Sequence, residues 1–81
     1  MAKPSPNHAG DPILLAIGRA IRDRRLERGL SQEGLAHEVE IDRSYMGGIE
    51  RGEHNVTIIN LSRICTCLDL RLSELLSDAG Q

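Results

Sequence analysis

Apolar residues recur three or four positions apart along most of the chain, in short runs that each begin at a residue able to cap a helix. Asp11 and Pro12 open the first run, because the Asp side chain can cap free amides and Pro fits the first helical position. The apolar residues that then share one helix face are Leu14, Ile17 and Ile21. This pattern of cap and helical spacing predicts an all-α chain whose first helix spans residues 12–28.

Two short helices are predicted after the first one. Gly29 ends the first helix, since glycine readily adopts the left-handed conformation that closes a helix. Ser31 is placed to cap a second helix over residues 32–38, and Asp42 to cap a third over residues 43–51. This part of the chain is thus expected to be two short helices separated by a tight turn.

The last third of the chain continues the helical pattern. Thr57 can cap a fourth helix, and a further leucine-rich turn or two is predicted over residues 72–76. The apolar residues at helical spacing in the fourth helix are Ile58, Leu61, Ile64, Cys65 and Leu68. The chain has no Phe or Trp and a single Tyr, so its core must be aliphatic, which suits packed helices better than a sheet.

The length of the chain allows a single compact domain, because 81 residues are enough for one small hydrophobic core. We expect a compact five-helix bundle over residues 11–77. Residues 1–10 concentrate Pro, Gly, Asn and Ser and are predicted to be a disordered arm. Residues 78–81 are predicted to form a short tail.

Charge is unevenly distributed along the chain. Ten Lys and Arg against 12 Asp and Glu give a net charge of -2, which disfavours binding to a polyanion through bulk charge. Residues 19–28, however, hold five arginines against Asp23 and Glu27, an excess of three positive charges. A local basic face is therefore available, and the last 13 residues carry an acidic excess.

Several classes of protein are disfavoured by what the sequence lacks. Cys65 and Cys67 lie two apart in a helical run, where a mutual disulfide would be strained, so reduced thiols and a cytoplasmic location are expected. No nearby His or further Cys completes a metal site, and no cofactor is expected. Without a glycine-rich phosphate loop or a nucleophile beside a base, the chain is not expected to be an enzyme. No signal peptide is expected, and no apolar run approaches the roughly 18 residues of a membrane span.

The most informative motif covers residues 30–55, which read LSQEGLAHEVEIDRSYMGGIERGEHN. This stretch resembles the helix-turn-helix of the Cro and phage-repressor superfamily, also called the XRE family. In that family one helix begins with Ser-Gln-Glu and carries Leu-Ala, and the next, the recognition helix, ends in Ile-Glu-Arg-Gly. The matching residues are Ser31, Gln32, Glu33, Leu35, Ala36, Ile49, Glu50, Arg51 and Gly52, with Ile21, Arg22, Arg25, Asn55, Leu61 and Leu68 outside the core of the motif. The resemblance implies a bacterial, nucleoid-associated transcriptional regulator whose partner is double-stranded DNA.

The resemblance also implies which residues meet the bases. A recognition helix lies in the major groove with its first residues at base edges. Arg43 and Ser44 occupy those positions, and Arg is well shaped for a bidentate contact to guanine. Tyr45 would bind a phosphate or lean on a thymine methyl, or else be half-buried against a neighbouring helix. Met46 and Ile49 would anchor the opposite side of the helix to the body.

Contacts to the DNA backbone are expected from the regions around this helix. The free amides and dipole at the start of the second helix favour a phosphate beside the Gln32 side chain. The paired glycines in the third helix would let the DNA backbone approach closely, or are simply tolerated. The predicted backbone contacts are Ser31, Gln32, Gly47, Gly48, His54, Asn55 and Arg25.

Two acidic residues are assigned to the fold and not to the DNA. A carboxylate at Glu50 would be repelled by phosphate, so Glu50 is expected to pair with Arg22, Arg25 or Arg51. Glu40 stands where the family usually has glycine in the turn. It is expected to adopt a left-handed conformation at a cost of about 1–2 kcal/mol.

A homodimer is expected, because one recognition helix reads few base pairs and proteins of this class bind half-sites about 10–10.5 base pairs apart. The leucines of the last third exceed what one small core can bury, and an exposed leucine patch would mark an association surface. The predicted interface residues are Leu68, Leu70, Leu72, Leu75 and Leu76.

Within the family, the run DRSYMGGIERGEHNVTIINLSRI is most similar to the controller proteins of restriction-modification systems. Those are dimers that activate or repress their own operon and a nuclease gene. A phage or plasmid repressor, or an antitoxin of the same fold that acts mainly through protein partners, is the alternative. RNA polymerase is a further candidate partner.

Overall fold

The computed structural model describes residues 7–81, which fold into five helices joined by short connections. These are α1 (Pro12–Glu27), α2 (Gln32–Glu38), α3 (Arg43–Glu50), α4 (Ile58–Cys67) and α5 (Leu72–Asp78). No strand is formed within the described residues. The predicted all-α, five-helix architecture is confirmed.

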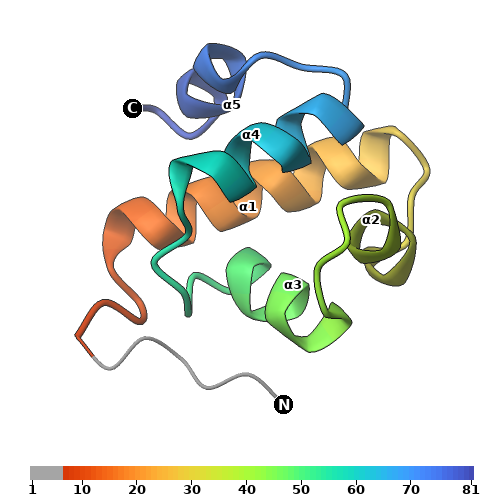
Figure 1. Cartoon of the computed structure of the whole chain (residues 1–81). Coiled ribbons are helices and arrows are strands. Elements are labelled where there is room, and N and C mark those ends of the chain that lie inside the picture. The colour runs from red at the N-terminus through yellow and green to blue at the C-terminus, as the bar shows by residue number, and fades with distance from the viewer. Residues whose placement is uncertain (1–6) are drawn as a thin grey trace.

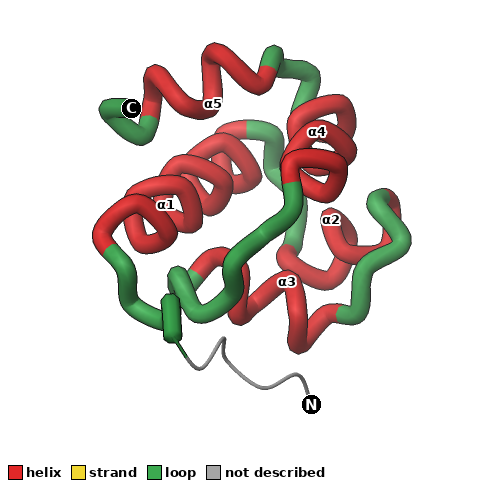
Figure 2. Tube along the Cα trace, turned by 60° about the vertical axis from the view of Figure 1, so that its left-hand side comes forward, coloured by secondary structure: helices red, strands yellow, loops and turns green. Residues whose placement is uncertain are grey.

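The longest helix, α1, lies between the other elements (Figure 1). It packs against α3 and against α5, while α2 contacts both α3 and α4. In both ribbon views α3 and α5 lie at opposite ends of the molecule, with α1 between them (Figures 1 and 2). The arrangement leaves one side of α3 at the outer surface.

Three of the four predicted N-caps form. The side chains of Asp11, Ser31 and Thr57 each accept a hydrogen bond of 2.9–3.1 Å from an amide in the first turn of the helix that follows. Asp42 is the exception, since its side chain makes no capping hydrogen bond to α3. Its carboxylate instead accepts a hydrogen bond from the Ser44 hydroxyl.

The turn between α2 and α3 has the predicted left-handed residue. Glu40 has a φ of 57°, and Asp69 has nearly the same value after α4. Two glycines, Gly29 and Gly52, close α1 and α3 with positive φ values of 68° and 75°. The connections therefore use local left-handed residues to reverse the chain within a few positions.

Both ends of the described chain form hydrogen-bonded turns. The amide of Gly10 donates to the Gly52 carbonyl at 2.8 Å, so residues 7–10 form an ordered turn against the end of α3. The rest of the predicted arm, residues 1–6, lies outside the described residues. At the other end α5 continues to Asp78, and the Gln81 amide donates to the Leu76 carbonyl at 2.8 Å.

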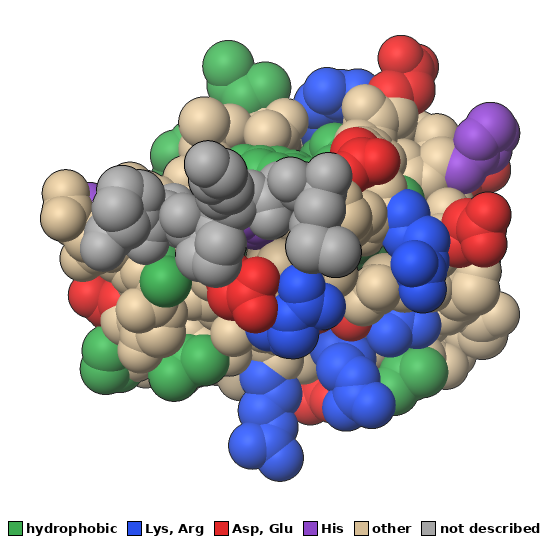
Figure 3. All heavy atoms as spheres, turned by 90° about the horizontal axis from the view of Figure 1, so that it is seen from below, with side chains coloured by type: hydrophobic (Ala, Val, Ile, Leu, Met, Phe, Trp, Pro, Cys, Tyr) green, Lys and Arg blue, Asp and Glu red, His purple; other side chains and the backbone are tan. Residues whose placement is uncertain are grey.

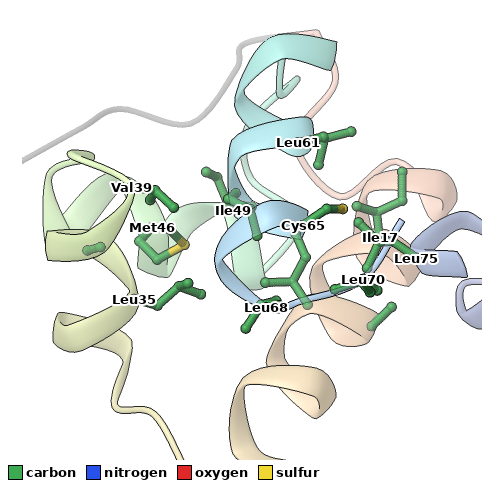
Figure 4. Close-up of a cluster of buried hydrophobic side chains, with 14 residues drawn as sticks. Ile17, Leu35, Val39, Met46, Ile49, Leu61, Cys65, Leu68, Leu70 and Leu75 are labelled. Atoms are coloured by element: carbon green, nitrogen blue, oxygen red, sulfur yellow. The ribbon is translucent and has the colours of Figure 1, made fainter. Parts of the chain in front are cut away.

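The core is aliphatic, as predicted, and draws on all five helices (Figure 4). Three of the leucines assigned to a dimer interface belong to it, because Leu68, Leu70 and Leu75 are only 2%, 9% and 0% exposed. They fill the protomer and are not available to a partner, which corrects that part of the prediction. Leu72 and Leu76 are half-buried at the edge of the core.

The first turn of α4 is unexpectedly exposed. Ile58 has the helical spacing of the apolar residues that follow it, yet Ile58 and Ile59 are 66% and 72% exposed. Burial in α4 begins only at Leu61. Ile58 therefore lies in α4 as its spacing predicts, but the first turn of this helix is not buried by the rest of the described chain.

Candidate nucleic-acid interface

The first turn of α3 carries the three residues predicted to meet base edges. Arg43 is exposed, and Ser44 and Tyr45 are half-exposed. On the opposite side of the helix, Met46 is fully buried and Ile49 is 2% exposed. One face of α3 is thus fixed to the core while its leading side chains remain accessible.

Basic side chains gather in a band on the face seen from below, the side where α3 lies in Figure 1, with acidic side chains among them (Figure 3). Within residues 7–81, the arginines held in ion pairs are Arg24, Arg25, Arg28 and Arg51. Arg43 is not one of them, so no carboxylate in that part of the chain neutralises its guanidinium.

Tyr45 stacks on His54, which lies in the loop after α3. The ring centroids are 4.4 Å apart and the ring planes are inclined by 24°. His54 is 4% exposed, and its Nε2 atom is buried without a hydrogen-bond partner among the described residues. This burial replaces the phosphate contact predicted for His54. Tyr45 is partly buried against the core as well as against this loop, and its contact with DNA stays a prediction.

A buried ion pair joins α1 to the end of α3. The Arg25 Nε atom donates to Glu50 Oε2 at 2.8 Å, and its Nη2 donates to Oε1 at 3.1 Å. Its Nη1 donates to the Leu30 carbonyl at 2.9 Å. The two side chains are only 9% and 3% exposed, so the predicted pairing of Glu50 with an arginine is confirmed. The same pair replaces the phosphate contact expected of Arg25.

Gln32, the first residue of α2, connects this ion pair to the surface. Its Nε2 donates to Glu50 Oε1 at 3.1 Å, and the side chain is half-exposed. An amide nitrogen carries two hydrogens, so the second one can still donate to a phosphate. Glu50 therefore sets the orientation of a side chain predicted to contact DNA.

The paired glycines of α3 are buried for reasons that lie within the protomer. A Cβ on Gly48 would overlap the His54 ring, whose Cδ2 atom would be 2.5 Å away. A Cβ on Gly47 would lie 2.9 Å from Arg51 Nη1 and 3.1 Å from Gln32 Oε1. Gly48 makes room for the His54 ring. This packing replaces the close approach of DNA that was predicted for Gly48. Gly47 adjoins Gln32 and stays a predicted DNA contact.

Two other predicted backbone contacts occupy exposed positions. Ser31 precedes α2 and uses its hydroxyl oxygen to cap that helix. Asn55 lies in the loop between α3 and α4. Both stay predictions.

Gly18 was not among the residues predicted to matter for the site. A Cβ at this position would overlap the Ile49 carbonyl oxygen and lie 2.6 Å from that of Glu50. Gly18 thus allows α1 to cross the backbone of α3 closely. The available signal was a glycine inside a helix, which costs about 1 kcal/mol relative to alanine and therefore calls for a compensating contact.

Within residues 7–81, no helix is long and apolar enough to cross a bilayer, and no three potential metal ligands cluster. Cys65 and Cys67 are free thiols. Burial raises the pKa of both, which disfavours the reactive thiolate.

The sequence matches the family model described as helix-turn-helix over residues 21–75. Among curated proteins, control protein C.MunI from a Mycoplasma species is 40% identical over 67 residues. The aligned region covers 82% of this chain and 90% of C.MunI.

Solved structures show the same likeness. The restriction-modification controller protein C.AhdI from Aeromonas hydrophila superimposes with a TM-score of 0.74 at 45% identity, covering 76% of this chain and 94% of that protein. SinR, a master regulator of biofilm formation whose structure contains DNA, has a TM-score of 0.70 at 34% identity, covering 74% and 97%. With its motif, its helices and these likenesses in agreement, the chain belongs to the helix-turn-helix family, of the XRE type.

Proposed function

We propose that this protein is a homodimeric transcriptional regulator that binds a pseudo-palindromic DNA operator with α3 in the major groove. The observation that carries the proposal is the placement of Arg43, Ser44 and Tyr45 on the accessible side of a helix whose other side is buried. A helix held in this way can enter a groove without loss of core contacts. Ser31, Gln32, Gly47 and Asn55 complete the site as contacts to the DNA backbone.

The relatives support a proposal for the regulated genes. C.MunI is named a control protein, and C.AhdI is a restriction-modification controller. By that likeness the chain would control a restriction-modification operon. Activation of such an operon would bring RNA polymerase to the bound dimer, which makes the polymerase a candidate second partner.

The exposed start of α4 supports a different dimer surface from the one predicted. Among residues 7–81, Ile58 and Ile59 are the two most exposed of the large apolar side chains. Such side chains gain free energy when a second copy covers them. The proposed two-fold interface therefore centres on the first turn of α4.

A second candidate function, protein binding without DNA, is favoured by the net charge of -2. The salt dependence of DNA affinity distinguishes the two candidate functions. Affinity for a duplex should fall steeply between about 50 and 200 mM salt, because each phosphate contact releases condensed counterions. Weak, salt-insensitive DNA binding would favour the protein-binding function.

Replacing Arg43 by alanine should weaken operator binding by about 1–3 kcal/mol and relax the preference at one base pair per half-site, because a bidentate contact to guanine would be lost. The operator would first be selected from random duplexes with the full chain, and dissociation constants then measured for single-base variants. Arg19→Ala is the matched control, since Arg19 lines a groove between α1 and α5. An equal loss on every sequence would make Arg43 a phosphate contact, and no loss would contradict the proposed site.

Replacing Ile58 and Ile59 together by glutamate should dissociate the dimer. Burying one isoleucine contributes about 1.5–3 kcal/mol, so the dimer dissociation constant should rise by at least about a hundredfold. Acidic residues at the start of a helix interact favourably with its dipole, so α4 should still form. Sedimentation equilibrium reports the mass, with Leu26→Glu, an exposed position on α1, as the control. A double variant that keeps the wild-type mass would place the interface elsewhere.

A further inference from the structure

The hydrogen bond between Ser44 and Asp42 has a fixed direction. The Ser44 hydroxyl donates to Asp42 Oδ2, and this bond holds the pKa of the Asp42 carboxyl below its usual range. An ionised carboxylate has no hydrogen to donate. Ser44 must therefore be the donor, and its only polar hydrogen is committed to Asp42.

Toward any other group, Ser44 can then act only as an acceptor. A hydroxyl has one hydrogen and two acceptor lone pairs, so an oxygen that has committed its hydrogen can still accept one. The acceptor that holds the hydroxyl in this way is Asp42 Oδ2.

The major groove distinguishes donors from acceptors at each base. Adenine and cytosine present exocyclic amines, which donate, whereas guanine and thymine present carbonyl oxygens, which accept. An acceptor-only side chain is attracted to the first pair and repelled by the second. The exposed carboxylate of Asp42, next to the recognition helix, acts in the same direction.

We infer that Asp42 is a positioning residue that restricts Ser44 to accepting, so that each half-site requires an amino base, adenine or cytosine, on the strand that Ser44 faces. The inference rests on the proposed function, namely on α3 lying in the major groove. It adds a preference for adenine or cytosine at one base pair of each half-site. The residue responsible for that preference, Asp42, need not touch the DNA.

The test measures dissociation constants of the full chain for an operator selected from random DNA, with all four bases placed in turn at each position of a half-site. For the wild type, one position should favour adenine and cytosine over guanine and thymine by about five- to a hundredfold, the usual effect of a mismatched base pair. Ser44→Ala should abolish the preference at that position and thereby identify it.

Asp42→Ala should also abolish the preference, because a released hydroxyl can rotate and donate to the keto bases. Asp42→Asn keeps an acceptor oxygen without the charge and should retain the preference. Asp23→Ala removes one negative charge from the groove between α1 and α5 and should leave the preference unchanged. Far-ultraviolet circular dichroism of each variant would check that the helices are intact.

The outcomes separate this inference from the proposed function. A wild type that selects no operator would count against the proposed function itself. An operator at which Ser44→Ala alters no position, or an Asp42→Ala variant that keeps the full preference, would overturn the inference alone. Loss of the preference in Asp42→Asn as well would overturn the hydrogen-bond account, because charge would then be the cause.

Discussion

Replacing Glu50 by alanine should destabilise the protein by about 3–5 kcal/mol, because it leaves the Arg25 guanidinium buried without its counter-charge. Both side chains are almost completely excluded from solvent, and two hydrogen bonds of 2.8 and 3.1 Å join them. Small domains have a total stability of about 5–15 kcal/mol, so this loss is a large share of the total and should lower the urea midpoint clearly. Urea denaturation followed by circular dichroism would measure the loss.

The matched control for this prediction is Asp78→Ala. The ion pair between Arg24 and Asp78 has the same distance of 2.8 Å, but its side chains are 32% and 38% exposed. Water and salt screen such a pair, so its removal should leave the urea midpoint almost unchanged. Replacing both buried partners, Arg25 by methionine and Glu50 by leucine, should recover most of the stability lost in Glu50→Ala. Equal midpoints for Glu50→Ala and the wild type would contradict the assigned role.

Local signals explain why the helices could be predicted closely from the sequence. Each of α1, α2 and α4 begins after a residue whose own side chain bonds an amide of the following turn. Glycines with positive φ follow α1 and α3. These interactions involve residues a few positions apart, so the sequence alone contains them.

Burial within the site could not be predicted in the same way. His54 is a polar residue in a loop, and only its stack on Tyr45 and the space left by Gly48 bury it. Asp42 has the residue type of a cap, but the Ser44 hydroxyl competes for its carboxylate. Both outcomes depend on how side chains meet once the helices are packed.

Three of the leucines predicted at the dimer interface, Leu68, Leu70 and Leu75, lie in the core for a related reason. Counting the leucines of the last third shows an apolar excess, but it does not say which side chains the core takes. The structure places Leu75 in the core and leaves Ile58 exposed. Burial in α4 begins only at Leu61, after the first turn of the helix. A sequence can therefore show an excess of apolar side chains without showing which of them the core leaves exposed.

Replacing Gly18 by alanine should destabilise the protein by up to about 2 kcal/mol, the overpacking cost less the helix-propensity gain, and weaken operator binding as well. The added methyl group would meet the backbone carbonyls of Ile49 and Glu50, which cannot rotate away as a side chain would. Overpacking of this kind commonly costs about 1–3 kcal/mol. Alanine also brings a gain of about 1 kcal/mol in helix propensity, so the overpacking cost must exceed that gain for the variant to be destabilised. The clash can be relieved only by a displacement of α1 away from α3. That displacement would move the recognition helix, so operator affinity should fall even at temperatures where the variant is folded.

Gly47→Ala distinguishes this clash from a general effect of replacing a helical glycine. The nearest atom to its Cβ would be Arg51 Nη1 at 2.9 Å, the end of a side chain that is 60% exposed and can swing aside. Gly47→Ala should therefore match or exceed the wild type in urea denaturation, because the helix propensity of alanine is gained without a backbone clash. If Gly18→Ala were equally stable, α1 and α3 would have room to separate at no cost, and the close crossing would not be what positions the DNA-binding helix.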